Sequence, residues 1–115
     1  NDILTALDKS FARIEFDLSG IIQTANDSFV SALGYRLDEI VGKHHRIFCE
    51  PEWANSSSYR EFWHQLESGS IQSGEYKRIG KAGNVVWINA NYCTIKDVSG
   101  KPYKVIKYAR DIKVS

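Results

Sequence analysis

The sequence predicts one α+β domain, a five-stranded antiparallel sheet with its helices packed on one face. Two short strand patterns come first, helical patterns follow, and three longer strand patterns end the chain. Every link between successive strands is either short enough for a hairpin or contains the helices, as an antiparallel sheet requires. At 115 residues, the chain also has the length of a single domain.

The composition excludes several classes of protein. Hydrophobic residues make up 43% of the chain and charged residues 25%, which is typical of a globular domain. The formal net charge of +1 gives no reason to expect a nucleic-acid or membrane-surface partner. No apolar run reaches the roughly 18 residues of a membrane span, so no membrane insertion is expected. The only cysteines, Cys49 and Cys93, are too few for a disulfide framework and indicate a cytoplasmic protein.

The first elements form a hairpin behind a short leader. Residues 1–10 have the pattern of an amphipathic lead-in, and the domain itself is expected to span 11–115. Apolar and polar residues alternate over Ala12–Leu18, as in a half-buried strand. Ser19–Gly20 then turns the chain into a second strand over Ile21–Thr24, which completes the predicted hairpin.

Two short helices should follow this hairpin. Asn26 precedes an apolar helical pattern that stops at Gly34, and asparagine is a favoured N-cap residue. A second short helix is expected over Leu37–Val41. The next stretch, His44–Ser57, has no regular pattern and is expected to be irregular.

The clearest helix begins where Ser58 and Glu61 have the spacing of a capping box. Its apolar residues lie at positions i, i+3, i+4 and i+7, so they form one wide stripe that should face the core. These residues are Tyr59, Phe62, Trp63 and Leu66. Gly69 is expected to end the helix.

Three strands are expected over Gly74–Ile79, Val85–Ile95 and Tyr103–Ile112. Side chains alternate between the two faces of a strand, so the long middle strand can be divided by parity. Its mostly apolar row, expected in the core, is Val86, Ile88, Ala90 and Tyr92, and its outward row is Trp87, Asn89, Asn91 and Cys93. The last strand has apolar residues on both rows, so its inward face stays open.

An ordered set of short segments resembles a PAS domain over Phe11–Ile112. The segments are 24–29 (TANDSF), 34–35 (GY), 38–42 (DEIVG), 76–83 (YKRIGKAG), 86–91 (VWINAN) and 109–112 (ARDI). Within PAS domains, 44–49 (HHRIFC) and 59–63 (YREFW) are similar to the sensor domains of bacterial chemotaxis (methyl-accepting) transducers. The similarity is to the aerotaxis and biofilm-dispersion types.

This resemblance implies a PAS fold and a sensory input module rather than an enzyme. Such a domain detects redox state, oxygen or a small ligand in an internal pocket and signals to a separate output domain. The resemblance implies FAD as the first cofactor candidate, haem as the second, and no cofactor as the third. The alternative is a cofactor-free PAS module for dimerisation or protein interaction. No glycine-rich phosphate loop and no catalytic triad order supports an enzyme.

Candidate cofactor contacts follow from the same resemblance. They are Trp63, Asn26, Phe48, Ile88 and Tyr92. Trp63 matches a tryptophan that stacks on the adenine of FAD in aerotaxis-type sensors, although its spacing alone fits a core anchor. Asn26 matches an asparagine that supports FAD, although the N-cap role is sufficient by itself. Glu50 departs from the pattern, because a carboxylate would oppose the pyrophosphate of FAD.

His44 and His45 are the candidate haem ligands. Haem-binding transducers of this family have a histidine near the start of the long helix and a tryptophan on the last strand. This sequence has neither residue at those places, so the haem pattern is not matched. The alternative is two polar loop residues with local hydrogen bonds. No metal site is predicted, since a His-His-x-x-x-Cys cluster is weak evidence for one.

The outward face of the sheet is the expected signalling surface. Its candidate residues are Trp87, Asn91, Tyr108 and Asp111. An exposed tryptophan on a sheet usually marks an interface, so the expected partners are a second copy, a neighbouring PAS domain or a following signalling helix. Lys77, Arg78 and Lys81 form a basic cluster on a hairpin that should be solvated rather than bind nucleic acid.

Overall fold

The structure is a computed structural model that describes residues 11–111, with the backbone alone for Asp111. The predicted lead-in over residues 1–10 lies outside the described residues, as does Ile112. The elements are β1 (Ala12–Phe16), β2 (Ile22–Ala25), α2 (Asp27–Leu33), α3 (Leu37–Ile40), the 3-10 helix η1 (His45–Phe48), α4 (Pro51–Ala54), α5 (Ser57–Glu67), β3 (Gln72–Ile79), β4 (Val85–Lys96) and β5 (Pro102–Asp111).

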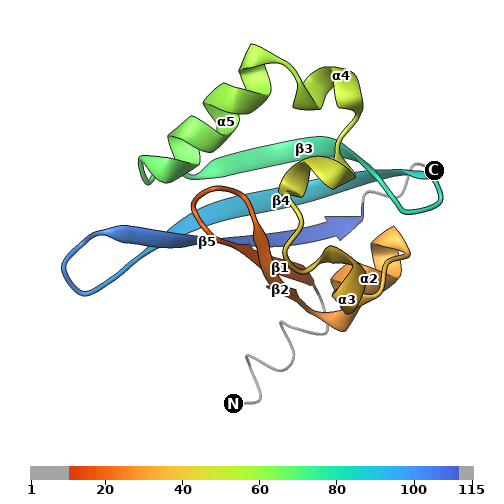
Figure 1. Cartoon of the computed structure of the whole chain (residues 1–115), viewed down its shortest axis with the longest axis horizontal. Helices are drawn as coiled ribbons and strands as arrows, with labels where there is room; N and C mark the ends of the chain where they lie inside the picture. Colours follow the sequence, from red (N-terminus) through yellow and green to blue (C-terminus); the bar gives the residue numbers. More distant parts are fainter. Residues whose placement is uncertain (1–10, 112–115) are drawn as a thin grey trace.

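One five-stranded sheet with the order β2-β1-β5-β4-β3 organises the molecule (Figure 1). All of its strand pairs are antiparallel, and the helices lie in the crossover between β2 and β3. The predicted α+β class and strand number are confirmed. The first and last strands, β1 and β5, pair with each other in the middle of the sheet.

The inner face of the sheet carries the core. Ile14 and Phe16 of β1 are buried there with the predicted row of β4, in which Ile88, Ala90 and Tyr92 are buried. The parity of β4 is therefore confirmed. On β5, the inner row is Val105, Lys107 and Ala109, all of them buried. A lysine stands in the middle of this row, which is why apolar periodicity could not assign its faces.

Helix α2 is held at both ends as its sequence predicts. The Asn26 side chain accepts a hydrogen bond from the backbone N–H of Phe29 at 3.0 Å, the usual N-cap bond. Gly34 ends the helix in the left-handed conformation, with φ of 76°, which glycine adopts without strain. These caps fix the helix that covers one end of the inner sheet face.

Two details of the helical region differ from the predictions. The stretch His44–Ser57, expected to be irregular, contains η1 and α4. The long helix α5 begins two residues earlier than expected, because Ser56 and not Ser58 is the N-cap. The Ser56 hydroxyl accepts from the backbone N–H of Tyr59 at 3.2 Å and donates to the Trp53 carbonyl at 2.6 Å. Three consecutive serines offer the same capping chemistry, and the link to α4 selects the first.

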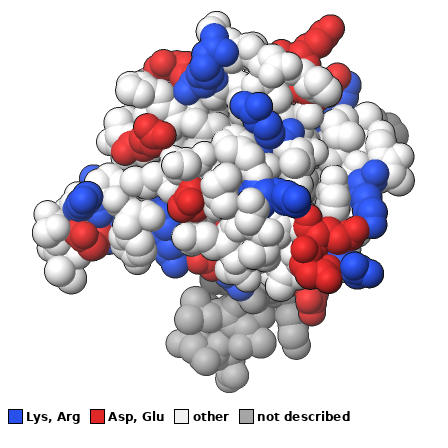
Figure 2. All heavy atoms as spheres, viewed as in Figure 1, with Lys and Arg blue, Asp and Glu red and all other residues white. Residues whose placement is uncertain are grey.

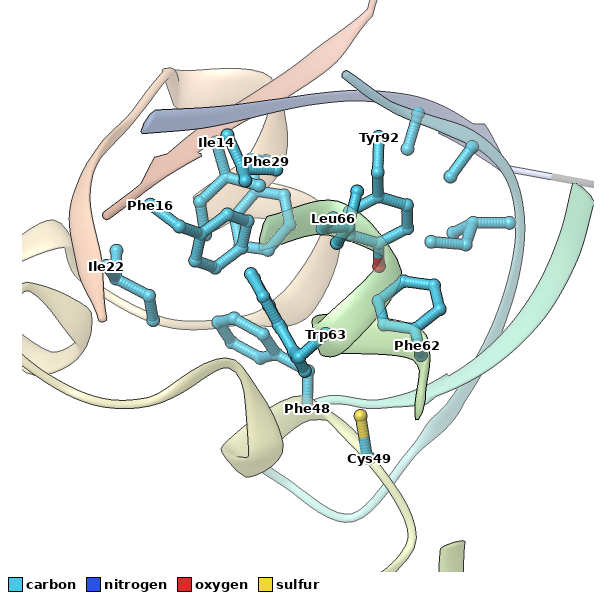
Figure 3. Close-up of a cluster of buried hydrophobic side chains, with 14 of the residues drawn as sticks. Ile14, Phe16, Ile22, Phe29, Phe48, Cys49, Phe62, Trp63, Leu66 and Tyr92 are labelled. Atoms are coloured by element: carbon cyan, nitrogen blue, oxygen red, sulfur yellow. The ribbon is translucent and has the colours of Figure 1, made fainter. Parts of the chain in front are cut away.

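Helix α5 covers the other end of the inner face with the predicted apolar stripe. Tyr59, Phe62, Trp63 and Leu66 are all buried. Figure 3 shows Phe62, Trp63 and Leu66 of this helix beside Tyr92 of β4, whose hydroxyl oxygen points into the cluster. The hydroxyl of Thr94 in β4 donates to the Leu66 carbonyl at 2.6 Å and ties the helix end to the sheet.

The surface shows no large field of one charge on the face drawn in Figure 2, where acidic and basic residues are interspersed. Among the described residues, no helix is long and apolar enough to cross a membrane. This face therefore gives no electrostatic sign of a nucleic-acid site.

Candidate functional site

A buried histidine is the centre of the polar interior under α5. His45 lies on η1 and has 0% of its surface exposed. Its Nδ1 lies 2.7 Å from the hydroxyl oxygen of Tyr59, and its Nε2 lies 2.9 Å from that of Tyr92. The ring stacks on Phe62 with centroids 6.2 Å apart. Both ring nitrogens are thus satisfied by hydroxyl groups, as buried polar groups usually are.

Tyr92 connects this histidine to a buried arginine. Arg78 of β3 is 2% exposed, and its Nη2 donates to the Tyr92 hydroxyl at 2.9 Å. Its Nη1 donates to the Lys77 carbonyl at 3.0 Å, whereas its buried Nε has no hydrogen-bond partner among the described residues. The guanidinium also lies 4.8 Å from the ring centroid of Tyr76 and 5.3 Å from that of Trp53.

Three titratable groups near Arg78, those of His45, Tyr92 and Cys49, are neutral near pH 7. Burial, followed by the charges of Arg78 and Lys107, keeps the pKa of His45 well below its ordinary value. Burial raises the pKa of the Tyr92 hydroxyl to about 12, although Arg78 partly opposes that shift. Burial also raises the pKa of the Cys49 thiol, whose sulfur lies 3.7 Å from Nδ1 of His45. None of these groups supplies a negative charge.

A cavity of about 160 Å³ lies between α2 and the sheet. Its apolar walls include Phe29, Leu33 and Ile88, and its lining is completed by Ala12, Ser28, Ala32, Ala109, Arg78, Lys107 and Arg110. Lys107 is only 1% exposed, and its Nζ lies 5.0 Å and 5.6 Å from the ring centroids of Tyr92 and Phe29. Burial and then the charge of Arg78 hold the pKa of Lys107 well below its ordinary value.

A model of the family described as the PAS fold matches residues 22–109 of the chain. The chain belongs to the PAS fold family. The predicted similarity to sensors of the aerotaxis and biofilm-dispersion types is confirmed as well. The PAS domain is 48% identical to the Biofilm dispersion protein BdlA of Pseudomonas aeruginosa over 109 residues, which are 95% of this chain and 26% of that protein.

Other relatives agree with this assignment. The Aerotaxis receptor of Escherichia coli is 35% identical over 75 residues, 65% of this chain and 15% of that receptor. The chain thus spans about a quarter or less of these two proteins. A Light-Oxygen-Voltage domain studied with a flavin analogue superimposes with a TM-score of 0.81 at 19% identity, covering 98% of this chain and 86% of that one. The PAS domain of a Colwellia psychrerythraea protein gives 0.80 at 20% identity, covering 96% and 94%.

The predicted cofactor contacts are all in the interior of the PAS domain, but they do not converge on one site. Of the five, only Ile88 lines the cavity. Phe48, Tyr92 and Trp63 are buried in the aromatic core. Asn26 is engaged locally: besides capping α2, its side chain accepts from the Arg13 N–H at 2.9 Å and donates to the Phe11 carbonyl at 2.9 Å. The geometry of Asn26 therefore fits the N-cap role, the alternative to a contact with FAD.

The interior does not fit FAD. A cavity of about 150 Å³ holds a molecule the size of benzene, so the cavity here is too small for the three-ring flavin. Trp63, which the resemblance places against the adenine of FAD, has the rings of Phe16 and His45 with centroids 5.5 Å away. The faces on which the adenine would stack are therefore crowded by side chains.

The histidines do not fit haem either. Binding iron through His45 would break a hydrogen bond to Tyr59 or Tyr92, because both of its ring nitrogens are engaged. Nδ1 of His44 accepts the backbone N–H of Arg46 at 3.0 Å and so caps η1. Within residues 11–110, no three His, Cys, Asp or Glu side chains cluster as metal ligands would.

Three of the four predicted signalling residues, Trp87, Asn91 and Tyr108, lie on the outer face of the sheet. Trp87 is 45% exposed, and Asn91 is opposite Tyr108 in the β4–β5 register, with both side chains exposed. The Ser73 hydroxyl donates to Oδ1 of Asn91 at 2.6 Å. Asp111 is opposite Ile88 at the end of β5, and its side chain lies outside the description.

The prediction that Arg78 is solvated with Lys77 and Lys81 is wrong, because Arg78 is buried beside the cavity while its neighbours in the cluster are not. Lys107 was not singled out at all. The available signal was parity: Lys107 shares a row with Val105 and Ala109, and Arg78 shares one with Tyr76. Charged residues are so seldom buried that this signal is easily discounted.

Proposed function

We propose that this chain is the cytoplasmic sensory input module of a chemotaxis-type signal transducer. It detects a small ligand in its internal cavity and signals through the outer face of its sheet. The identity to BdlA and the Aerotaxis receptor supports the proposal, as does the predicted exposure of Trp87. Redox sensing through FAD is the finer form of this proposal, and the small cavity argues against it.

The observation that carries the proposal is the alternation along β4. Ile88 lines the cavity on the inner face, whereas the adjacent Trp87 is exposed on the outer face. A change in the position of β4 caused by a ligand therefore reaches the surface through a single peptide unit. The sheet would then have one arrangement with the ligand bound and another without it. Signalling needs only that these two arrangements differ in their affinity for a partner.

The partner of the outer face is either a second copy of the domain or the helix that follows β5. Both would cover Trp87 and its exposed neighbours Asn91 and Tyr108. The end of β5 at Asp111 is paired with Ile88, so a following element would start next to the strand that lines the cavity.

A cavity-filling variant tests the proposal. Ala32→Leu adds apolar volume to the cavity wall, and Ser31→Leu adds the same side chain to an exposed position of α2. We expect Ala32→Leu to change amide hydrogen exchange over residues 86–91, with Ser31→Leu unchanged. Thermal melting of both variants separates a local change from a general loss of stability. Identical exchange over β4 in all three proteins would reject the proposal.

The second candidate is a cofactor-free interaction module, which the side-chain-filled aromatic interior favours. An absorption spectrum of the purified domain distinguishes the two, since flavin bands or a Soret band would indicate a cofactor sensor. Trp87→Ala should weaken self-association about tenfold or more in sedimentation experiments, with Tyr103→Ala as the matched exposed aromatic control. Association lost in Trp87→Ala together with an unresponsive β4 would favour the interaction module.

A further inference from the structure

We infer that the cavity between α2 and the sheet binds a small organic anion, a monocarboxylate whose apolar body is about the size of a benzene ring. This inference rests on the proposed sensory function and names the chemical class of its ligand. The cavity, the two buried basic side chains beside it and the absence of a buried acid among the described residues carry it.

Two buried basic side chains place positive charge beside the cavity. Arg78 and Lys107 come from β3 and β5, both line the cavity, and they are 2% and 1% exposed. Buried charged groups are normally paired with an opposite charge. The ion pairs among residues 11–110 all join other groups, namely Arg13–Glu15, Lys104–Glu15, Arg36–Asp38, Lys77–Glu50 and Lys81–Glu39. The described part of the domain thus leaves the charge beside this cavity uncompensated.

The contacts of Arg78 and Lys107 do not satisfy either side chain fully. Arg78 donates to one neutral hydroxyl and one backbone carbonyl, and its buried Nε has no partner among the described residues. Lys107 faces the rings of Phe29 and Tyr92, and such contacts stabilise a cation without neutralising it. Hydrogen-bonding capacity and the charge of Arg78 therefore remain available on the cavity side of the sheet.

The size and lining of the cavity favour an organic ligand. Its volume of about 160 Å³ is close to that of a cavity that holds benzene, about 150 Å³. The walls are mainly apolar, so a bare inorganic anion would leave Phe29, Leu33 and Ile88 without a contact. A guanidinium binds a carboxylate through two parallel hydrogen bonds, which favours a carboxylate head on an apolar body.

The protonation of Lys107 should make binding depend on pH. Among the described residues, the titratable or charged groups near it are Arg78 from β3, Tyr92 from β4, Arg110 from β5, and Cys49 and His45 from the η1 region, and none of these is an Asp or a Glu. Burial and Arg78 lower the pKa of Lys107, and a bound carboxylate would raise it again. Binding should therefore take up a proton, and affinity should fall as the pH rises.

Titration calorimetry of the intact chain with benzoate tests the inference. Benzamide is the control ligand because it has nearly the same shape and no charge, and sodium chloride at equal ionic strength controls for inorganic anions. We expect benzoate to bind at least about tenfold more tightly than benzamide. Lys107→Met should weaken benzoate binding about thirtyfold or more, the low end of the cost of removing one partner of a buried charge pair. Lys77→Met, next to Arg78 but on the outer side of β3, should leave it unchanged.

Three results would overturn the inference. They are no binding of benzoate, butyrate or hexanoate, equal binding of benzoate and benzamide, and equal losses in Lys107→Met and Lys77→Met. A melting transition confirms that each variant is folded. The two proposals fail separately. If benzoate binds without changing hydrogen exchange over β4, the anion site stands and the sensory function fails. If Ala32→Leu changes that exchange but no carboxylate binds, the sensory function stands and the anion site fails.

Discussion

The two ends of the inner sheet face both bury polar groups, but they do so in different ways. Under α5, His45 uses both ring nitrogens in bonds to Tyr59 and Tyr92, and aromatic rings fill the space around it. Under α2, Arg78 and Lys107 border a cavity, and no described acid forms an ion pair with either.

The difference separates structure from function within one core. A satisfied polar network in a filled interior stabilises a single arrangement and needs no ligand. Unneutralised charge next to open space reduces stability, and a ligand can recover the loss. Resemblance to flavin sensors directs attention to Trp63 and the α5 end, whereas the physical chemistry directs it to the α2 end. The following variants test whether the two ends differ in this way.

The largest effect is expected for His45→Ala. It removes a buried ring and leaves the hydroxyls of Tyr59 and Tyr92 without that partner, so it should lower the free energy of unfolding by about 3–5 kcal/mol. Urea denaturation measures this loss. His44→Ala is the matched control, since His44 is only half-buried, and it should cost less than half as much. Equal losses would mean that the network is not the stabilising feature.

Tyr92→Phe should have the next largest effect, a loss of about 2–3 kcal/mol. The Tyr92 hydroxyl serves both His45 and Arg78, whereas the Tyr59 hydroxyl is bonded to His45. Tyr59→Phe should therefore cost only about 1–2 kcal/mol in the same denaturation experiment. The reverse order would show that Arg78 does not depend on Tyr92.

Lys107→Met should have the opposite sign and raise the free energy of unfolding by about 1–2 kcal/mol in the absence of ligand. Methionine keeps most of the volume of the side chain and removes an uncompensated buried amine. Lys77→Met, at the surface, should change stability by less than about 0.5 kcal/mol. Destabilisation by Lys107→Met would show that the lysine is already paired.

The smallest effect is a pH dependence with two windows. The pKa of Lys107 is lower in the folded chain than its ordinary value of about 10.4, so just below that pH the unfolded chain binds more protons and stability should rise with pH. The lowered pKa of His45 should likewise reduce stability as the pH falls below about 6.5. In thermal melts, Lys107→Met should remove the dependence of the melting temperature on pH in the upper range. The dependence in the lower range should remain.

The sequence was sufficient for the fold and for one strand in detail. The order of the strand patterns gives the sheet, and alternation along β4 places Ile88 inside and Trp87 outside, as the structure shows. The cap at Asn26 is equally local, because it depends on a side chain and the backbone three residues later. Features set by neighbours in sequence can be predicted from sequence.

The contents of the interior could not be predicted in the same way. His45 is buried and its adjacent His44 is half-buried, and nothing in a 3-10 helix of four residues distinguishes them. Burial of Arg78 and Lys107 depends on strands that are distant in the chain and on a cavity that no periodicity records. The choice among three serines for the N-cap depends on the bond from the Ser56 hydroxyl to the Trp53 carbonyl, which the capping-box spacing does not reveal.

The alternation of side chains along β3 and β4 has a consequence for how such domains diverge. Lys77 and Arg78 are adjacent, as are Trp87 and Ile88, yet the members of each pair belong to different environments. Under the proposed function, mutations at one parity would alter what the cavity accepts, and those at the other would alter what the surface recognises. Gene duplication could then produce paralogues that keep an old output and acquire a new stimulus, or the reverse, through substitutions at neighbouring codons.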